Sequence, residues 1–316
     1  MHIVCSTDDN YVMPTGIMLT SLCVNNPKID IHVHVLFENL KESNIKSLTK
    51  TVEFYNKRIS FYPIEPDLFS NFPMGKEYQN SHIQSMATYY RLYMAEILPP
   101  TIDKVIYLDG DIIVRGPLDS LWKCDISNYY IGGVPDEFNN RTDHYNRLKY
   151  PQSQGYFNAG VILVNLKKWR ETNIINDFLL FIKNYPERLF AHDQDVLNYI
   201  FRESKITLEI KYNMQNAYFY KKEYNCLSWE FEEQLLEGQR NPVLVHFTYI
   251  PKPWYKNCYH PYKNEFLYYK KLSLWKEYPT NKIFNYRKYI KELLKQLLVK
   301  LKVLSPKRDM RTWFIK

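Results

Sequence analysis

The chain has 316 residues, 45% of them hydrophobic and 24% charged, with a formal net charge of +8. This composition is that of a globular protein and excludes disordered, collagen-like and coiled-coil chains. The five cysteines are an odd number without a Cys-x-x-Cys pair, so we expect neither a disulfide framework nor a zinc ribbon. We expect a reducing, cytoplasmic compartment, because we find no secretory signal and no apolar stretch long enough to span a bilayer.

Strand-like and helix-like segments alternate along most of the chain. In chain order, the patterns predict a strand at 2–6, a helix at 15–25, a strand at 31–37, a helix at 41–55, a strand at 59–63, a loop at 68–79, a helix at 81–98, strands at 104–108, 131–134 and 161–165, helices at 174–183 and 193–201, and a strand at 243–247. Residues 212–231 are aromatic and irregular and remain unassigned. The alternation predicts an α/β fold with a mostly parallel sheet covered on both faces.

The last 35 residues differ from the rest of the chain. Residues 282–316 contain eleven Lys and Arg but two acids, which leaves residues 1–281 nearly neutral. Apolar residues at helical spacing form one stripe in this tail: Ile290, Leu293, Leu294, Leu297, Leu298, Leu301 and Leu304. We therefore expect a domain at 1–281 and a basic amphipathic tail at 282–316 that associates with an anionic membrane surface. The alternative is a helix packed on the body or on a second subunit. Nucleic acid is not expected, because the body lacks a basic face.

An Asp-Gly-Asp motif follows the predicted strand at 104–108. Side chains at positions i and i+2 of an extended segment point the same way, so Asp109 and Asp111 form a hard oxygen site suited to Mg²⁺ or Mn²⁺. Open α/β sheets bind their ligands at the carboxyl ends of their strands. The alternatives are a solvated turn and a phosphatase-type motif, but Ile112-Ile113 does not fit the latter.

Six motifs occur in a fixed order along residues 1–260. They are Ile3-Val-Cys-Ser-Thr-Asp-Asp-Asn-Tyr11, Thr88-Tyr-Tyr-Arg-Leu92, Val105-Ile-Tyr-Leu-Asp-Gly-Asp111, Phe157-Asn-Ala-Gly160, Asp193-Gln-Asp195 and His246 followed by Lys252-Pro-Trp254. In these motifs the chain resembles the family 8 glycosyltransferases, which include bacterial lipopolysaccharide galactosyl- and glucosyltransferases and glycogenin. The resemblance implies a GT-A fold, a UDP-sugar donor, a divalent metal and transfer with retention of anomeric configuration.

The resemblance also implies roles for residues that hold the metal and the nucleotide. Asp109, Asp111 and His246 match the metal ligands, with Mn²⁺ or Mg²⁺ as the ion, and Lys252 matches a diphosphate-binding lysine. Asp8, Asn10 and Tyr11 match positions that hold uracil and ribose, Tyr11 by stacking on the base. Taken alone, each has an ordinary structural reading. His246 would then be a histidine at a strand end, Lys252 a surface lysine, and the Asp8 region an N-cap and loop cluster.

Further matches concern the donor sugar and catalysis. Arg91, Asn158, Asp193 and Gln194 match donor-sugar contacts, while Ala159 and Gly160 would allow close backbone approach of the sugar. Asp136 matches an acid near the reaction centre. Gln194 is a poor nucleophile, which favours attack on the face that UDP leaves, with Asp136 or Asp193 as the alternative nucleophile or stabiliser. Arg91 could equally form a helix-surface ion pair, Asn158 a turn, and Asp193 a helix cap.

Taken together, these features predict a retaining transferase of glucose or galactose acting on a saccharide or glycolipid acceptor, such as lipopolysaccharide, at the inner face of a bacterial membrane. One departure is Tyr249, where the family often has glycine near the diphosphate. A side chain fits there if it points outward, but tyrosine restricts positive φ, so the local phosphate geometry is left open. Two alternatives from other classes are a metal-dependent nucleotidyltransferase or sugar-phosphate hydrolase, and a catalytically silent membrane-tethered carbohydrate-binding protein.

Overall fold

The computed structural model describes residues 1–69, 72, 86–220 and 229–301. Seven strands form one sheet in the order β3-β2-β1-β4-β7-β6-β8, and β5 pairs with β9 in a separate two-stranded sheet. The strands are β1 (His2–Thr7), β2 (His32–Phe37), β3 (Arg58–Pro63), β4 (Lys104–Leu108), β5 (Ile112–Val114), β6 (Ile131–Pro135), β7 (Phe157–Asn165), β8 (Lys205–Thr207) and β9 (Leu244–His246).

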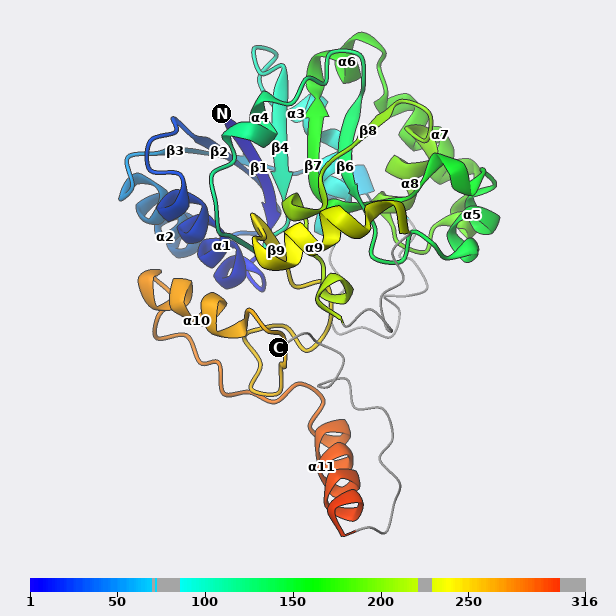
Figure 1. Cartoon of the computed structure of the whole chain (residues 1–316). Helices are drawn as coiled ribbons and strands as arrows, with labels where there is room; N and C mark the ends of the chain where they lie inside the picture. The colour runs from blue at the N-terminus through cyan, green and yellow to red at the C-terminus, as the bar shows by residue number, and fades with distance from the viewer. Residues whose placement is uncertain (70–71, 73–85, 221–228, 302–316) are drawn as a thin grey trace.

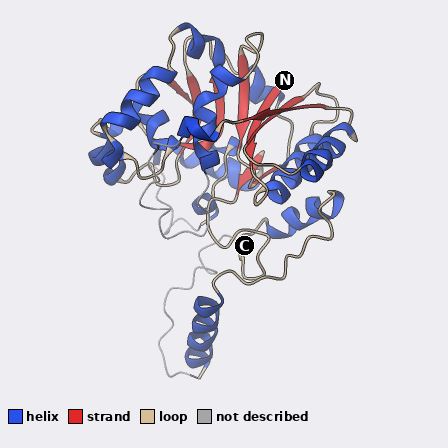
Figure 2. Ribbon diagram, turned by 180° about the vertical axis from the view of Figure 1, so that it is seen from behind, coloured by secondary structure: helices blue, strands red, loops and turns tan. Residues whose placement is uncertain are grey.

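Helices cover both sides of the large sheet (Figure 1, Figure 2). The α-helices are α1 (Val12–Asn25), α2 (Glu42–Glu53), α3 (Met94–Ile97), α4 (Asp119–Lys123), α5 (Thr142–Leu148), α6 (Leu166–Glu171), α7 (Ile175–Asn184), α8 (Asp193–Ile200), α9 (Glu232–Arg240), α10 (Lys263–Leu272) and α11 (Tyr286–Lys300). Short 3₁₀ turns are η1 (Pro66–Phe69), η2 (Met86–Tyr93), η3 (Gln152–Gln154), η4 (Pro186–Arg188), η5 (Ile210–Tyr212), η6 (Asn216–Phe219) and η8 (Trp229–Phe231).

The core is divided by the sheet. Alternate residues of β1 belong to different clusters: Ile3 and Cys5 pack with α1 and α10, whereas Val4 packs with η2, α6, α7 and α8. This alternation follows from the two-residue period of a strand. Strands covered on both faces need apolar side chains at nearly every position, which is why the inner strands read as continuous apolar runs.

The sheet changes direction next to the Asp-Gly-Asp motif. Strands β3, β2, β1 and β4 run parallel, and β7 lies antiparallel to β4. Asp109-Gly-Asp111 joins β4 to β5, and β5 pairs with β9 so that Ile112 lies opposite His246. The two-stranded sheet therefore brings His246 beside residues that precede it by more than a hundred positions.

Most of the predicted elements are confirmed, and the differences have local causes. β7 begins at Phe157 rather than 161, because its pairing with β6 continues past an irregularity at Gly133 and Val134. The described part of the predicted helix 81–98 is the 3₁₀ turn η2 followed by the short α3, not one α-helix. Short elements such as β5, β8 and α4 escaped prediction, since three to five residues show no period. The predicted loop at 68–79 lies largely outside the described residues.

Helix α11 projects away from the rest of the described chain in both views (Figure 1, Figure 2). The leucines whose side chains are described are exposed, with Leu294 55% and Leu297 52% accessible. The packing of the leucines against the body, the alternative reading of the tail, is therefore absent from the described part of this helix. The predicted tail beyond residue 301 lies outside the described residues. No described helix has both the length and the apolar character needed to cross a membrane.

Candidate active site

Three potential metal ligands converge at the end of β4. The Nε2 atom of His246 lies 3.3 Å from Asp111 Oδ1 and 3.7 Å from Asp109 Oδ2. One ligand atom from each residue lies within 4.8 Å of the other two. Two carboxylates and an imidazole suit Mn²⁺ or another divalent ion of similar hardness. The three residues predicted as metal ligands are therefore adjacent in space, and their donor atoms fit a divalent cation.

A residue that sequence reasoning missed orients the histidine. The Nδ1 atom of His246 lies 3.0 Å from the side-chain oxygen of Asn213. An amide oxygen accepts a hydrogen bond, so Nδ1 carries the proton and Nε2 presents its lone pair to the two carboxylates. Asn213 in turn donates to the side-chain oxygen of Asn158 at 2.9 Å. Asn213 lies in the irregular aromatic segment 212–231, where no pattern marks it.

Backbone space at Gly160 makes this convergence possible. A Cβ atom at this position would lie 2.3 Å from His246 Cε1 and 2.7 Å from Asp109 Oδ2. The backbone of the same glycine accepts a hydrogen bond from the Asp109 amide at 2.9 Å. The pair of metal-site side chains thus approaches Gly160 closely, and the approach of a sugar to this glycine stays a prediction.

The Asp111 carboxylate contacts an ammonium group and a hydroxyl group. Lys252 Nζ lies 2.7 Å from Asp111 Oδ2, and the Tyr11 hydroxyl donates to the same oxygen at 2.9 Å. Burial disfavours the carboxylate form, but the charges of Lys252 and, when its ring is protonated, of His246 outweigh it and hold the pKa of Asp111 below its usual range. The carboxylate is therefore ionised at neutral pH, as metal binding requires. Lys252 is buried, so it is not the ordinary surface lysine of the alternative reading.

Arg91 joins Asp109 to Asp193. Its Nη2 atom lies 2.9 Å from Asp109 Oδ1, its Nε atom lies 2.8 Å from Asp193 Oδ2, and its guanidinium stacks 4.2 Å above the Tyr107 ring. Arg91 is 5% exposed, so its ion pairs do not lie on a helix surface. Asp193 is 2% exposed and is the first residue of α8, whose N-cap residue is His192. Burial raises the pKa of Asp193 to about 6, although the Arg91 charge opposes this change.

A second polar cluster contains the residues expected near the donor sugar. Gln194 Nε2 and Asn158 Nδ2 each donate to Asp136 Oδ2 at 3.2 Å. Gln194 Oε1 accepts from the Ala159 amide at 2.9 Å, and Asn158 Oδ1 accepts from the Gly160 amide at 3.0 Å. Asp136, Asn158 and Gln194 thus form one hydrogen-bonded unit that adjoins the metal-site residues through Gly160 and Asn213.

The loop after β1 contains the residues expected at the nucleotide. Asp8 Oδ1 accepts hydrogen bonds from the backbone amides of Asn10 and Tyr11 at 2.9 and 2.8 Å. Asp8 therefore stabilises the loop between β1 and α1. The Tyr11 ring meets the Trp254 ring edge to face, with centroids 5.7 Å apart. Asn10 is exposed and lies in the turn before α1. An aromatic pair beside a carboxylate loop is a surface on which a planar base can stack.

Tyr249 and Glu137 connect the segment after His246 to the Asp136 loop. The Tyr249 ring stacks on Phe138 at 6.1 Å, and Tyr249 is not among the described residues with positive φ. The Tyr249 backbone is therefore unstrained, and its ring packs against Phe138. Glu137, 3% exposed, accepts hydrogen bonds from the Thr248 hydroxyl at 2.8 Å and from the Ala217 amide. Sequence reasoning missed Glu137.

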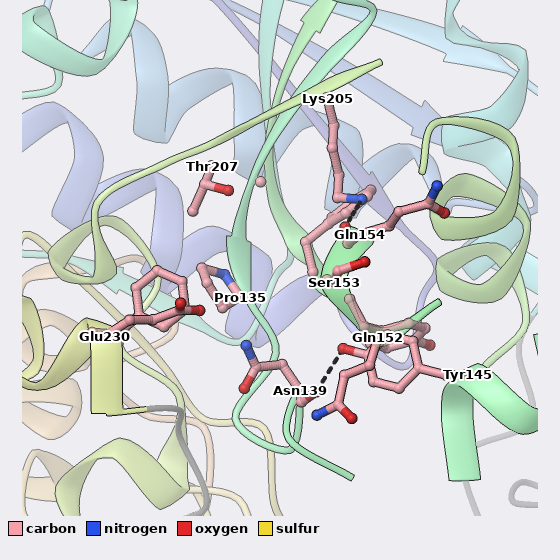
Figure 3. A pocket seen from close by; sticks show the side chains of 14 residues that line it. Pro135, Asn139, Tyr145, Gln152, Ser153, Gln154, Lys205, Thr207 and Glu230 are labelled. Carbon is pink, nitrogen blue, oxygen red and sulfur yellow. Dashed lines mark hydrogen bonds between the residues drawn. The ribbon is translucent and has the colours of Figure 1, made fainter. Parts of the chain in front are cut away.

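A polar pocket of about 410 Å³ lies beside β6 (Figure 3). The Tyr145 hydroxyl donates to the backbone oxygen of Asn139 at 2.6 Å, and Lys205 Nζ donates to that of Gln154 at 2.5 Å. None of the three candidate metal ligands lines this pocket. The chemistry-bearing side chains are therefore in a different place, and the pocket receives no catalytic role.

Known proteins share both sequence and fold with this chain. The profile described as glycosyl transferase family 8 matches residues 2–258. General stress protein A of Bacillus subtilis is 29% identical over 87% of this chain and 94% of its own length. Lipopolysaccharide 1,2-glucosyltransferase of Escherichia coli K12 is 25% identical over 94% of this chain and 86% of its own length.

A solved structure extends the likeness to three dimensions. The crystal structure of galactosyltransferase LgtC in complex with donor and acceptor sugar analogs matches with a TM-score of 0.77 and 27% identity, over 87% of this chain and 96% of that one. The implied GT-A fold is confirmed, with its mixed, mostly parallel sheet flanked by helices. Because the family match covers most of the chain, this protein belongs to glycosyl transferase family 8.

Proposed function

We propose that the protein is a metal-dependent retaining hexosyltransferase that moves glucose or galactose from a UDP-sugar to a saccharide acceptor. The observation that supports this most strongly is the convergence of Asp109, Asp111 and His246, with Lys252 2.7 Å from Asp111. The relatives named as lipopolysaccharide glucosyl- and galactosyltransferases favour both hexoses and a lipopolysaccharide or other cell-surface glycan as the acceptor.

In this proposal Asp109, Asp111 and His246 hold Mn²⁺ or Mg²⁺. When bound, the ion compensates the negative charge that develops on the departing UDP. The imidazole favours Mn²⁺, since Mg²⁺ prefers an all-oxygen shell. Lys252 adds a positive point charge for a diphosphate oxygen, because its ammonium already lies beside the metal carboxylate. Asp8, Asn10 and Tyr11 hold the uridine, with Tyr11 and Trp254 providing the stacking surface.

The donor sugar lies, in this proposal, against Arg91, Asn158, Ala159, Gly160, Asp193 and Gln194. Asp193 is a poor nucleophile, because it is buried and tied to Arg91 and to the Thr88 hydroxyl. Asp136 already accepts two amide hydrogen bonds, which lower its nucleophilicity. We therefore favour attack by the acceptor on the face that UDP leaves, with the Gln194 amide stabilising positive charge on the sugar. A glycosyl adduct on Asp136 or Asp193 in quenched reactions, detected by mass spectrometry, would refute this mechanism.

A donor-hydrolysis assay tests the enzymatic proposal. The full chain should release UDP slowly from UDP-glucose or UDP-galactose in the presence of Mn²⁺, and chelation should stop the release. Asp109→Asn should abolish the release, whereas Asp177→Asn, which removes an exposed carboxylate on α7, should leave it unchanged. Absence of UDP release with every hexose donor would favour the silent carbohydrate-binding reading. Release of sugar 1-phosphate with UMP instead would mean that the pyrophosphate bond is cleaved and would favour chemistry at phosphorus over glycosyl transfer.

We also propose that residues 282–316 bring the enzyme to the anionic, cytoplasmic face of a bacterial membrane. The exposed leucines of α11 and the net positive charge of this segment support an interfacial helix. The full chain should co-sediment with phosphatidylglycerol liposomes, and Leu294→Ser with Leu297→Ser should weaken this without changing charge. Equal sedimentation of the wild type with neutral liposomes would exclude recognition of anionic lipid. Unchanged binding after deletion of 282–316 would exclude the tail as the anchor.

A further inference from the structure

Three histidines lie together at the end of the sheet opposite the candidate active site. His2 begins β1 and His32 begins β2, where the parallel register places them side by side, and His34 follows two residues later on the same face. The N-terminus and β9 lie at opposite ends of β1 (Figure 1). From His2 to Thr7 the strand rises about 16 Å, so this cluster is separate from Asp109, Asp111 and His246.

The geometry of the cluster is that of a metal site. One ring nitrogen from each of the three histidines lies within 4.8 Å of the other two. His2 Nδ1 and His34 Nε2 are 2.9 Å apart. In a tetrahedral zinc site with Zn–N bonds of about 2.0–2.1 Å, ligand nitrogens lie about 3.3 Å from one another. Small ring rotations therefore suffice to place three nitrogens around one ion, with water as the fourth ligand.

The outer ring nitrogens already have partners on β3. His34 Nδ1 lies 3.1 Å from the Tyr62 hydroxyl, and His32 Nε2 lies 2.8 Å from Ser60 Oγ. A second hydrogen bond of this kind fixes the orientation and tautomer of a metal-bound histidine. With its proton on Nδ1, His34 presents the lone pair of Nε2 to the cluster. A neutral His2 does the same from Nδ1 once its own proton is on Nε2.

The surroundings favour neutral imidazoles, the form that binds metal. Burial, together with the neighbouring histidines and Arg58, lowers the pKa of His34 to about 3. Burial also lowers the pKa of His2 and His32. Two positive charges lie nearby: Arg58, which pairs with Asp30 at 2.9 Å, and the N-terminal ammonium, which donates to the Asp30 backbone oxygen at 2.8 Å. His2 and His32 are half-buried, which leaves the cluster open to solvent on one side.

We propose that His2, His32 and His34 form a second metal site, specific for a borderline transition metal and best suited to Zn²⁺, that links β1 to β2. Imidazole-only ligands select Zn²⁺, Ni²⁺, Cu²⁺ or Co²⁺ over Mg²⁺ and Mn²⁺. The site is thus chemically distinct from the carboxylate-containing site at the other end of β1. Its effect is on the stability of the sheet, since an ion that binds only the folded chain stabilises it by mass action.

Isothermal titration calorimetry with ZnCl₂ tests this proposal. The parent protein for this test is the full chain without a polyhistidine tag and with the substitutions Asp109→Asn and Asp111→Asn. These substitutions prevent zinc from binding at the carboxylate-containing site. We expect binding of one zinc ion per chain. In the same background His32→Gln should weaken binding by at least about tenfold. His144→Gln is the control, because this partly buried histidine stacks on Tyr156 outside both clusters.

A second variant and a spectroscopic probe are used if circular dichroism shows that His32→Gln is not folded. His2→Gln should weaken zinc binding equally, and Co²⁺ in the parent protein should give the visible absorption of a four-coordinate, nitrogen-ligated ion. Both zinc binding and Co²⁺ binding should be weakened by at least about tenfold in the His2 variant and unchanged in the His144 variant. The proposal is overturned if the parent protein binds no zinc, if the zinc affinity is unchanged after loss of His2 or His32, or if the His144 control is weakened to the same extent.

Discussion

Replacing Arg91 by glutamine should destabilise the protein in a way that depends on pH. Arg91 pairs with Asp109 and Asp193 in a region where both Arg91 and Asp193 are almost fully buried. Removing one partner of a buried ion pair costs about 3–5 kcal/mol, because a carboxylate is left without compensation. At about 2–4 °C per kcal/mol, this corresponds to a fall in Tm of roughly 10 °C.

The pH dependence follows from Asp193. Its pKa of about 6 in the folded protein exceeds the ordinary value of 3.8, so the folded chain holds the proton more tightly than the unfolded chain. Its contribution to stability is complete below the unfolded pKa and is lost as pH rises through the folded pKa. Without Arg91 the pKa of Asp193 in the folded protein rises further, so the free energy of unfolding continues to fall up to a higher pH. One unit of pKa is worth about 1.4 kcal/mol, so Arg91→Gln should lose at least this much more stability at pH 8 than at pH 5.

Urea unfolding at the two pH values measures this difference. Adding Asp193→Asn to Arg91→Gln should restore part of the stability at pH 8 and flatten its pH dependence. The control is Arg147→Gln, which breaks a different ion pair, with the buried Asp195 (2.6 and 2.9 Å), and leaves Asp193 untouched. Asp193→Asn should rescue nothing in that background. Equal losses at both pH values in Arg91→Gln, or rescue in the Arg147 background, would refute the reasoning.

Three further predictions concern the same region. Asp111→Asn should reduce Mn²⁺-dependent transfer to near zero in a UDP-release assay, and turnover at the wild-type rate would contradict its assignment as a metal ligand. Gly160→Ala should weaken Mn²⁺ binding in calorimetry, because a Cβ atom there overlaps His246 and Asp109. Gly116→Ala is the control and should not weaken binding, since its Cβ atom would lie 3.6 Å from its nearest neighbour. Equal Mn²⁺ affinities of the two variants would contradict this prediction. Burial and the charge of Asp136 raise the pKa of Glu137 to about 8, so its contribution to stability is lost as pH rises toward 8. Glu137→Gln should remove that decline, and urea unfolding curves that fall in parallel with pH in both proteins would exclude it.

Residues in sequence motifs were predictable, while their partners were not. Asp109 and Asp111 follow a recognisable strand, and the order of the six motifs identified His246 and Gln194 as companions. Asn213 and Glu137 have no such local signal. Their importance comes from contacts with His246 and Thr248, which depend on how distant segments pack. Likewise β5 has three residues, too few to show a period, although its pairing with β9, which lies within the predicted strand 243–247, places His246.

The candidate metal site is complete only while β5 is paired with β9. The ribbon has three residue pairs and is separate from the seven-stranded sheet. Brief opening of so short a ribbon separates the histidine from the carboxylates while the main sheet stays intact. An ion bound by residues of both segments would therefore slow amide hydrogen exchange at Val245 and Ile113 more than in β1 or β4. The exchange rates of these two amides would then report how much of the site is occupied.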